Sequence, residues 1–419
     1  MSKFIVEESP PLRGAVRVCG AKNSVLPILA GTLLTENECI IHDVPPLTDV
    51  SIMQRLIEDL GAKSDWDVSN ETIRVSAKKI IKHEAAYELV GKMRASFLTM
   101  GPLLARSGQA KMSLPGGCQI GERPVELHLK GFAALGAKIT KEHGYVEAKA
   151  KRLKGANIYL DFPSVGATEN IMMAAVLAEG QTVLQNCAVE PEIVDLANFL
   201  TSIGADIRGT GTDTIKINGV EKLGGGEYTI IPDRIEAGTF MVAAAITKGD
   251  IVIENVVADH LKPVIAKLTE AHVQIEESEA GLRVHTDGRL NSIDIKTLPY
   301  PGFPTDMQAQ LMSLLALTEG TSVVIETVFE NRFMHAAELK RMGADILIEG
   351  RTSVVEGVKR LTGTQVRATD LRAGAGLVLA GLRANGITEI SDIYHIDRGY
   401  CKLDEKLRRL GARIRRIEE

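Results

Sequence analysis

One cysteine lies in a glycine-rich loop instead of an apolar segment. The stretch "SLPGGCQIGERPVELHL" places Cys118 directly after two glycines and in front of Gly121 and Arg123. A thiol that precedes a helix and lies near an arginine is in a positive field, which favours the reactive thiolate. The other role is that of a small buried hydrophobic residue. The glycines leave both roles open, so Cys118 is a candidate catalytic group.

A helix is predicted directly after this loop. Pro124 suits its first turn, where a missing N–H costs least. Apolar residues then recur on one side at helical spacing: Val125, Leu129, Phe132 and Leu135. Such a helix would hold the cysteine loop at its N-terminal end.

A lysine stands at the start of the first predicted helix, "KNSVLPILAGTLL" after Gly20 and Ala21. Asn23 is predicted to cap this helix and Pro27 to lie near its first turn. Lys22, together with free backbone N–H groups, would suit an anion. The alternative for Lys22 is an ordinary solvated side chain.

Four arginines are predicted to open long apolar helices: Arg94, Arg332, Arg372 and Arg398. The helix dipole disfavours cations at that end, so four such placements indicate a bound anion. Solvated or capping arginines would explain any one of them, but all four together less well.

A carboxylate follows three prolines in "PYPGFPTDMQAQLMSLLAL". Asp306 is expected in the first turn or at the cap of the helix that follows. Held rigidly in a cleft, the same carboxylate could accept a proton from a substrate hydroxyl.

The composition excludes several classes of protein. Lys and Arg total 49 against 54 Asp and Glu, without long like-charge runs, which disfavours nucleic-acid binding. No segment is apolar enough to cross a membrane and the N-terminus has no signal-peptide pattern, so we expect a cytoplasmic protein without membrane insertion. Five scattered cysteines predict neither a disulfide framework nor a zinc site.

Common cofactor motifs are absent. The sequence contains no G-x-x-x-x-G-K-[ST], no G-x-G-x-x-G after a predicted strand and no H-E-x-x-H. The histidines are scattered, and His128 falls on the helix after the cysteine loop. The sequence therefore predicts no P-loop, no Rossmann fingerprint and no zincin site, and it gives no support for metal chemistry.

The chain repeats itself about every 70 residues. One phrase, an apolar helix followed by a turn and a strand-like run, has its turn residue at six positions: Asn37, Gly108, Gly180, Gly249, Gly320 and Gly386. A second phrase, an amphipathic helix that ends in Gly-Ala, recurs five times. In the remaining module, the fourth, the corresponding segment is "IAKLTEAHVQI" without Gly-Ala. This pattern predicts an α/β protein of six similar modules, three to a lobe. We expect the seam at "KLGGGEYTIIPDR", the fourth module to begin near Ile230, and a ligand cleft between the lobes.

These motifs together resemble one family. "GAKNSVLPILAGTLL", "LPGGCQIGERPVELHLKGFAALGA", "VGATENIMMAAVLAEG", "PGFPTDMQAQLMSLLAL", "VFENRF" and "ATDLRAGAGLVLAGL" resemble, in this order, the enolpyruvyl transferases that act on UDP-N-acetylglucosamine. The resemblance implies a two-domain inside-out α/β barrel with three modules per domain. Residues 22–230 would form the first domain, and residues 1–21 with 231–419 the second.

The implied reaction transfers the enolpyruvyl group of phosphoenolpyruvate to the 3′-hydroxyl of UDP-N-acetylglucosamine and releases phosphate, the first committed step of peptidoglycan synthesis. Neither metal nor cofactor is implied. The resemblance makes Cys118 the proton donor to the methylene carbon and the target of the epoxide fosfomycin. Asp306 would be the base for the 3′ proton, with Lys22 and Arg398 also catalytic.

The same resemblance implies the substrate contacts. Phosphoenolpyruvate would be held by Lys22, Asn23, Arg94, Arg123, Arg332, Arg372 and Arg398. The nucleotide sugar would contact Asn23, Arg94, Arg123, Pro124, Val125, Glu126, Leu127, Ser164, Val165, Gly166, Asp306 and Val328. Phe162 and Pro163 depart from the family pattern just before Ser164, which bears on the uridine contacts.

Two rival functions stay open. A 5-enolpyruvylshikimate-3-phosphate synthase would share the architecture and phosphoenolpyruvate, but "AKNSVLP" and "GGCQIGERP" argue against it. A non-catalytic nucleotide-sugar sensor would have no need for the acid, base and cations that the chain retains.

Overall fold

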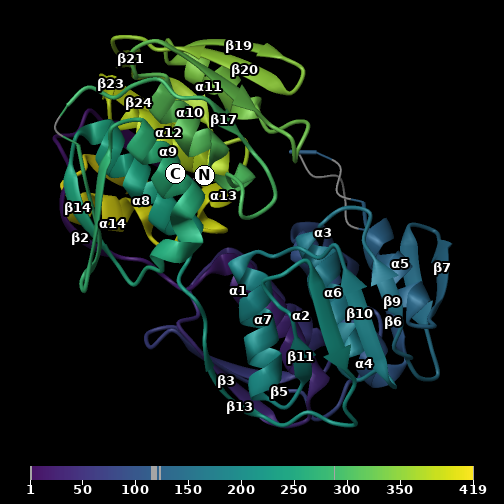
Figure 1. The fold of residues 1–419 in the computed structure, drawn as a ribbon. Coiled ribbons are helices and arrows are strands. Elements are labelled where there is room, and N and C mark those ends of the chain that lie inside the picture. The colour runs from purple at the N-terminus through teal and green to yellow at the C-terminus, as the bar shows by residue number, and fades with distance from the viewer. Residues whose placement is uncertain (1, 115–119, 122–123, 287, 419) are drawn as a thin grey trace. The chain divides into compact units, whose positions relative to one another are not determined.

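The computed structural model describes residues 2–114, 120–121, 124–286 and 288–418 (Figure 1). Internal contacts divide this part of the chain into two compact units. Unit 1 contains residues 2–19, 120–121 and 232–418, and unit 2 contains residues 20–114 and 124–231. The predicted domains, 22–230 and 1–21 with 231–419, stay a prediction, because units defined by contacts are not by themselves independently folding domains.

Unit 2 consists of three similar modules in sequence. Its helices are α1 (Lys22–Gly31), η1 (Thr32–Leu34), α2 (Thr48–Asp59), α3 (Tyr87–Lys92), η2 (Arg94–Thr99), α4 (Met100–Ser107), α5 (Glu126–Ala134), α6 (Val165–Ala175) and α7 (Pro191–Ser202). Its strands are β3 (Glu38–His42), β4 (Lys63–Asp67), β5 (Thr72–Ser76), β6 (Gln109–Ser113), β7 (Lys138–Glu142), β8 (Tyr145–Lys149), β9 (Asn157–Tyr159), β10 (Gln181–Gln185), β11 (Asp206–Arg208), β12 (Thr214–Asn218) and β13 (Gly226–Thr229).

Unit 1 repeats this plan and adds the N-terminal strands. Its helices are α8 (Arg234–Thr247), η3 (Ala258–Leu261), α9 (Lys262–Glu270), η4 (Thr305–Met307), α10 (Gln308–Leu315), α11 (Met334–Arg341), α12 (Leu371–Gly381), α13 (Tyr394–Asp397) and α14 (Leu403–Arg409). Its strands are β1 (Lys3–Glu7), β2 (Arg13–Arg17), β14 (Asp250–Glu254), β15 (Gln274–Ser278), β16 (Gly281–His285), β17 (Ile295–Lys296), β18 (Thr321–Ile325), β19 (Asp345–Glu349), β20 (Thr352–Glu356), β21 (Leu361–Thr362), β22 (Gln365–Arg367), β23 (Ala384–Asn385), β24 (Ile387–Ser391) and β25 (Ile414–Ile417).

Each module contributes one sheet of three or four strands, and β21 pairs with β23 in a separate two-stranded sheet. In unit 2 the strand orders are β13-β3-β5-β4, β6-β8-β7 and β9-β10-β12-β11, and in unit 1 they are β2-β14-β16-β15, β17-β18-β20-β19 and β22-β24-β1-β25. In β14 and β12 buried residues alternate with partly or fully exposed ones, because one face packs on helices and the other faces solvent. The barrel of the prediction is therefore made of separate sheets and not of one continuous closed sheet.

The helices occupy the inside of each unit. The first helix of a module is buried on nearly every side: in α8, α10 and α12 almost all residues are buried, and these three helices contact one another. The second helix is amphipathic, as in α9, where only Val264 and Leu268 are buried. Gly376 allows α10 and α12 to approach closely, because a Cβ there would lie 2.8 Å from the carbonyl oxygen of Ala309. This arrangement confirms the predicted inside-out α/β fold.

The turn residues of the repeat take the expected left-handed backbone in most modules. Four of the six predicted turn residues have positive φ: Gly108, Gly180, Gly320 and Gly386. In the fourth module Lys248 takes the left-handed conformation instead, and Gly249 is required because a Cβ would lie 2.5 Å from the carbonyl oxygen of Leu12. The fourth module therefore keeps the turn, but the residue with left-handed backbone is Lys248, one position before the predicted Gly249.

The helix-ending glycine also has one exception. In five modules a glycine with positive φ ends the amphipathic helix: Gly61, Gly136, Gly204, Gly343 and Gly411. In the fourth module, where no glycine ends the amphipathic helix, His272 adopts the same conformation, with φ of 69°. A non-glycine residue there pays a backbone strain that the other modules avoid.

Candidate active site

Three of the predicted site residues meet in unit 1. One oxygen of Asp306, Oδ1, accepts a hydrogen bond from Nη2 of Arg332 at 2.8 Å. The other oxygen, Oδ2, accepts from Nε and Nη2 of Arg372 at 3.2 and 3.0 Å. The two arginine side chains are only 4% and 3% exposed, whereas the Asp306 side chain is 27% exposed. The cluster is therefore a partly exposed carboxylate between two buried guanidinium groups.

These contacts fix the charge of the carboxylate. Burial alone would raise the pKa of Asp306, but the charges of Arg372 and Arg332 outweigh it and hold that pKa well below its usual range. Burial works against the charge of Arg372 too, but its neighbours Tyr400 and Asp306 raise the pKa of its guanidinium. One carboxylate thus faces two arginines, which leaves the cluster with a net positive charge.

Helix ends position the members of the cluster. Asp306 lies in the first turn of η4, as predicted, but its side chain pairs with arginines and does not cap the helix. Arg372 is the second residue of α12, and the side chain of Asp370 caps this helix by accepting from the N–H groups of Arg372 and Ala373. Arg332 lies just before α11, a short helix with a polar outer face, so the expected long apolar helix is wrong there.

A buried glutamate that the sequence analysis did not select organises the same region. Glu326 is 1% exposed, and its Oε2 accepts from the hydroxyl of Thr305 at 2.9 Å. Its Oε1 accepts from the backbone N–H groups of Val328 and Phe329 at 2.8 and 3.1 Å. Thr305 in turn accepts from Nη1 of Arg332 at 3.3 Å. Glu326 therefore connects Val328, a predicted sugar contact, to the segment that carries Asp306. The one feature of the sequence that could have indicated Glu326 is its position directly after the strand β18.

The placement of Arg398 corrects a prediction. It does not open a long apolar helix but follows the last residue of α13, and the next helix, α14, begins only at Leu403. At the C-terminal end of a helix the dipole favours a cation, so the anion argument does not apply to this arginine. Burial and then the charge of Arg398 lower the pKa of His395, which places the guanidinium near that ring.

In unit 2 the predicted lysine has a buried partner. Lys22 is the first residue of α1, and its Nζ lies 2.7 Å from Oδ2 of Asp49, with side chains 11% and 2% exposed. Asn23 does not cap α1, since the N-cap residue is Ala21 and no side chain caps this end. Pro27 lies inside the helix and not near its start, so both of these local predictions are wrong.

Two predicted residues of unit 2 border a buried histidine. Burial and then the charge of Arg94 lower the pKa of His128 to about 3, so the ring is neutral near pH 7. Gly166 packs on the same ring, because a Cβ there would lie 3.3 Å from its Cε1 atom. Arg94 begins the short helix η2, which leads into α4. Arg94 and Gly166 are therefore brought together around His128.

The other predicted contacts of unit 2 lie at two helix starts. Ser164 caps α6 by accepting from the N–H of Ala167 at 3.4 Å, and Val165 and Gly166 are the first residues of that helix. Helix α5 begins at Glu126, so Pro124 lies before the helix and not in its first turn. The predicted apolar stripe is confirmed: Val125, Leu129, Phe132 and Leu135 are all buried.

Cys118 and Arg123 lie outside the described residues, so their predicted roles stay predictions. The cysteines in the described part of the chain, Cys19, Cys39, Cys187 and Cys401, form no disulfide with one another. Within the same part, no group of three or more His, Cys, Asp or Glu residues could hold a metal ion. No helix of the described residues is long and apolar enough to cross a bilayer.

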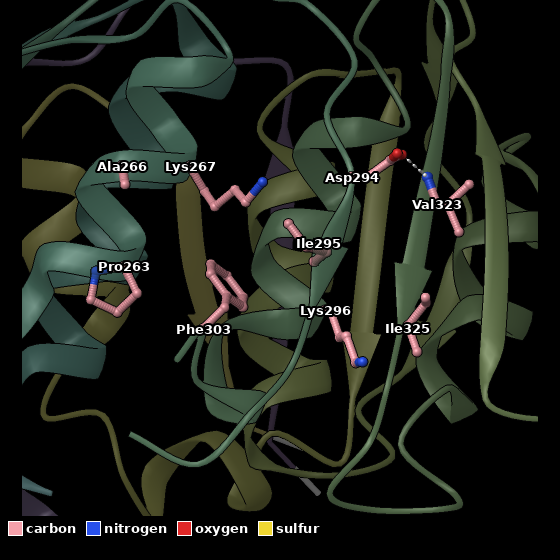
Figure 2. Close-up of a pocket in the computed structure, with 9 residues that line it drawn as sticks. All are labelled: Pro263, Ala266, Lys267, Asp294, Ile295, Lys296, Phe303, Val323 and Ile325. Carbon is pink, nitrogen blue, oxygen red and sulfur yellow. Dashed lines mark hydrogen bonds between the residues drawn. The ribbon is translucent and has the colours of Figure 1, made fainter. Parts of the chain in front are cut away.

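A pocket of about 390 Å³ lies elsewhere in unit 1 (Figure 2). Residues of α9 line one side, Ile295 and Lys296 of β17 lie between, and Val323 and Ile325 of β18 line the other side. Asp294 accepts from the N–H of Val323 at 2.7 Å and so braces this wall. None of the predicted site residues lines this pocket.

Residues 6–407 match the family model described as EPSP synthase (3-phosphoshikimate 1-carboxyvinyltransferase). The chain is 64% identical over 415 residues to UDP-N-acetylglucosamine 1-carboxyvinyltransferase 1 of Caldanaerobacter subterraneus subsp. tengcongensis, covering 99% of both proteins. It is 60% identical over 421 residues to UDP-N-acetylglucosamine 1-carboxyvinyltransferase 2 of Carboxydothermus hydrogenoformans, covering 100% of both.

Solved structures share the fold. The enolpyruvyl transferase NikO from Streptomyces tendae is 27% identical, with a TM-score of 0.90 over 99% of this chain and 98% of that one. An EPSP synthase from Acinetobacter baumannii is 22% identical, with a TM-score of 0.78 over the full length of both chains. The chain therefore belongs to the EPSP synthase family of enolpyruvyl transferases and, within it, to the UDP-N-acetylglucosamine 1-carboxyvinyltransferases.

Proposed function

We propose that this protein transfers the enolpyruvyl group of phosphoenolpyruvate to the 3′-hydroxyl of UDP-N-acetylglucosamine and releases phosphate. The observation that carries the proposal is full-length identity of 54–64% to relatives named for this transfer. The buried Arg332, Arg372 and Asp306 cluster supports it, because the reaction needs fixed cations for an anionic substrate and a carboxylate near the acceptor hydroxyl. The cytoplasmic location stays a prediction.

The cationic groups are proposed to hold phosphoenolpyruvate. They are Lys22, Arg94, Arg123, Arg332, Arg372 and Arg398, with Asn23 beside them. The structure of unit 1 supports this role for Arg372, because its Nη1 is buried and has no hydrogen-bond partner among the described residues. A buried guanidinium donor without a partner is costly, and a phosphate or carboxylate oxygen would satisfy it.

Asp306 is proposed to accept the 3′ proton of the sugar. With both arginines in place its low pKa makes it a weak base. An anionic substrate that draws the guanidinium charges toward itself would raise the pKa of Asp306 and strengthen the base when the acceptor hydroxyl is in place. The nucleotide sugar would otherwise contact Pro124 to Leu127, Ser164, Val165, Gly166 and Val328.

Cys118 is proposed to donate the proton to the methylene carbon. A thiol must be protonated for this role, although a cationic pocket favours the thiolate. Binding of the anionic substrate would raise the pKa of the thiol and supply the acid form. A thiol titration that phosphoenolpyruvate leaves unchanged would contradict this step.

Phosphate release with both substrates tests the function. We expect release only when UDP-N-acetylglucosamine and phosphoenolpyruvate are both present, and a loss of about 100-fold or more in Cys118→Ala, since positioned proton transfer contributes that much. Cys187→Ala is the matched control, because Cys187 is buried and its thiol donates to the carbonyl of Leu184.

Other outcomes of the same assay distinguish the transferase from the two rival functions, the shikimate reaction and a non-catalytic sensor. Release with 3-phosphoshikimate in place of the nucleotide sugar would favour the shikimate reaction. Binding of UDP-N-acetylglucosamine without any release from the intact protein would favour a sensor. Release that survives Cys118→Ala would keep the transferase and move the acid role to another residue.

A further inference from the structure

A tyrosine that no part of the proposed mechanism uses lies beneath the arginine–aspartate cluster of unit 1. Tyr400 is 1% exposed, and the guanidinium of Arg372 lies over its ring, 5.3 Å from the centroid. Its hydroxyl lies 2.9 Å from the hydroxyl of Thr239 on α8 and 3.1 Å from Nε2 of Gln310 on α10. Tyr400 therefore joins two central helices below the cluster.

The direction of each hydrogen bond in this network is fixed by the donors available. Thr239 gives its only hydroxyl hydrogen to the carbonyl of Ile235 at 2.8 Å, so it must accept from Tyr400. Tyr400 then accepts from the amide of Gln310, and Thr239 accepts from the same amide nitrogen at 3.2 Å. Burial raises the pKa of Tyr400 against the opposing charge of Arg372, so the phenol keeps the proton that it donates. The protons run in one direction, from Gln310 to Tyr400 to Thr239 to the backbone of α8.

The network reaches three residues of the proposed site. Nε2 of Gln310 also donates to the backbone carbonyl of Asp306 at 2.9 Å, so the same amide holds Tyr400 and the segment of Asp306. The ring of Tyr400 supports Arg372, because an aromatic face attracts a guanidinium. Arg398 lies two residues before Tyr400 in the same turn. A rigid phenol here would fix the direction in which Arg372 presents its unpartnered Nη1.

We propose that Tyr400 is a positioning residue. It holds Arg372 and, through Gln310, Asp306 in the arrangement that binds phosphoenolpyruvate. The proposal rests on the proposed function. It predicts that the hydroxyl of Tyr400 acts on phosphoenolpyruvate binding more than on the sugar or on folding, because Arg372 is the arginine in contact with the ring.

Tyr400→Phe tests the hydroxyl while keeping the ring under Arg372. We expect KM for phosphoenolpyruvate to rise about tenfold, since the loss of one buried hydrogen bond changes an equilibrium by about this factor, while KM for UDP-N-acetylglucosamine changes less than about threefold. The acid limb of the kcat/KM profile should move to higher pH, because a looser Arg372 would let the pKa of Asp306 rise. Thr239→Val removes the acceptor of the same hydroxyl and should reproduce the pattern.

Thr247→Val is the matched control for folding. Thr247 is buried on the same helix and donates to the carbonyl of Ala243 at 2.7 Å, as Thr239 does to Ile235, but it contacts no residue of the cluster. We expect Thr247→Val to lower the melting temperature without changing either KM or the pH profile. Tyr394→Phe, on an exposed tyrosine of unit 1, should change nothing.

The outcomes separate the inference from the function. An intact protein that releases no phosphate from the two substrates would overturn the proposed function itself. An active protein whose Tyr400→Phe and Thr239→Val variants lose only thermal stability, like Thr247→Val, would overturn the positioning role and leave the function standing. Equal increases in both KM values would also contradict it, because they would indicate a general loosening of unit 1.

Discussion

The two units place a buried amide at the same position of the repeat and use it differently. Asn170 in unit 2 and Gln310 in unit 1 each lie ten residues before the turn glycine of their module, Gly180 and Gly320. Asn170 has both side-chain atoms satisfied: it accepts from the N–H of Gly101 at 2.7 Å and donates to the carbonyl of Phe97 and to His128. Gln310 donates to Tyr400 and to the segment of Asp306, while its Oε1 has no partner among the described residues.

The difference shows how one scaffold position can serve structure in one unit and a site in the other. The closed network inside unit 2 holds helices together and, among the described residues, reaches the proposed site only through His128, so its loss should mainly cost stability. In unit 1 two buried polar atoms of the network, Gln310 Oε1 and Arg372 Nη1, have no hydrogen-bond partner among the described residues. Such atoms are expected where a bound ligand supplies the partner.

The pKa values of two carboxyl groups, Glu169 in unit 2 and Asp306 in unit 1, are shifted in opposite directions. Glu169, on α6 of unit 2, is 3% exposed, and burial followed by the charges of Glu192 and Glu190 raises its pKa well above the usual value. Asp306 has a lowered pKa because two arginines face it. Burial thus favours the neutral acid in unit 2, and local cations favour the anion in unit 1.

The largest expected effect comes from removing the charge of Asp306. Asp306→Asn keeps the size of the side chain but leaves Arg332 and Arg372 facing a neutral amide. We expect kcat to fall by about 100-fold or more if Asp306 is the base, together with a loss of about 3 kcal/mol in the free energy of unfolding. Steady-state kinetics and urea denaturation measure the two effects, and unchanged kcat would remove the base role.

The comparison of the two amides is tested by a matched pair of substitutions. Asn170→Leu leaves the N–H of Gly101, the carbonyl of Phe97 and His128 without their partner, so we expect a stability loss of about 3 kcal/mol with kcat and KM changed less than about threefold. Gln310→Leu should cost less stability and change KM for phosphoenolpyruvate more. Equal kinetic effects in both variants would break the contrast between a structural and a functional network.

The opposite charge states predict opposite responses to pH. The raised pKa of Glu169 contributes stability that is complete below about pH 4.5 and is lost as pH rises through its folded pKa. The lowered pKa of Asp306 contributes stability that is present above about pH 3.8 and is lost as pH falls. Glu169→Gln should therefore raise the melting temperature by about 2 °C or more at pH 8 and by less at pH 5. Glu179→Gln, on an exposed glutamate of the same unit, should show no such pH-dependent gain.

The smallest effect tests whether two modules of unit 1 differ in their scaffold. Gly343→Ala should cost about 1 kcal/mol from backbone strain alone, because φ is 92° and no atom lies within 4 Å of the added Cβ. His272→Gly, at the equivalent position, should stabilise by about 0.5 kcal/mol. If His272→Gly destabilises instead, the imidazole makes a contribution specific to the fourth module.

Local features of the fold followed from the sequence. Six modules, the apolar central helices and the turn glycines all reflect periodicity and backbone freedom within short stretches, which a single sequence displays directly. The local errors have local causes. Asn23 does not cap α1, and Pro27 lies inside it, because the N-cap is Ala21 and the helix begins at Lys22, two residues earlier than a cap at Asn23 requires. Arg398 was misplaced because α13 ends just before it.

The sequence by itself determined the repeated α/β architecture and the residue types of the site, including the carboxylate of Asp306 and the arginines that the family pattern selects. Only the tertiary structure decided which of them pair. Arg372 lies 66 residues from Asp306 in the chain, and Tyr400 lies 161 residues from Thr239. Periodicity reports which face of an element is buried, but a hydrogen bond between distant elements depends on how helices pack, which no local pattern encodes. Glu326 and Tyr400 therefore emerged only when the helices of unit 1 were placed together.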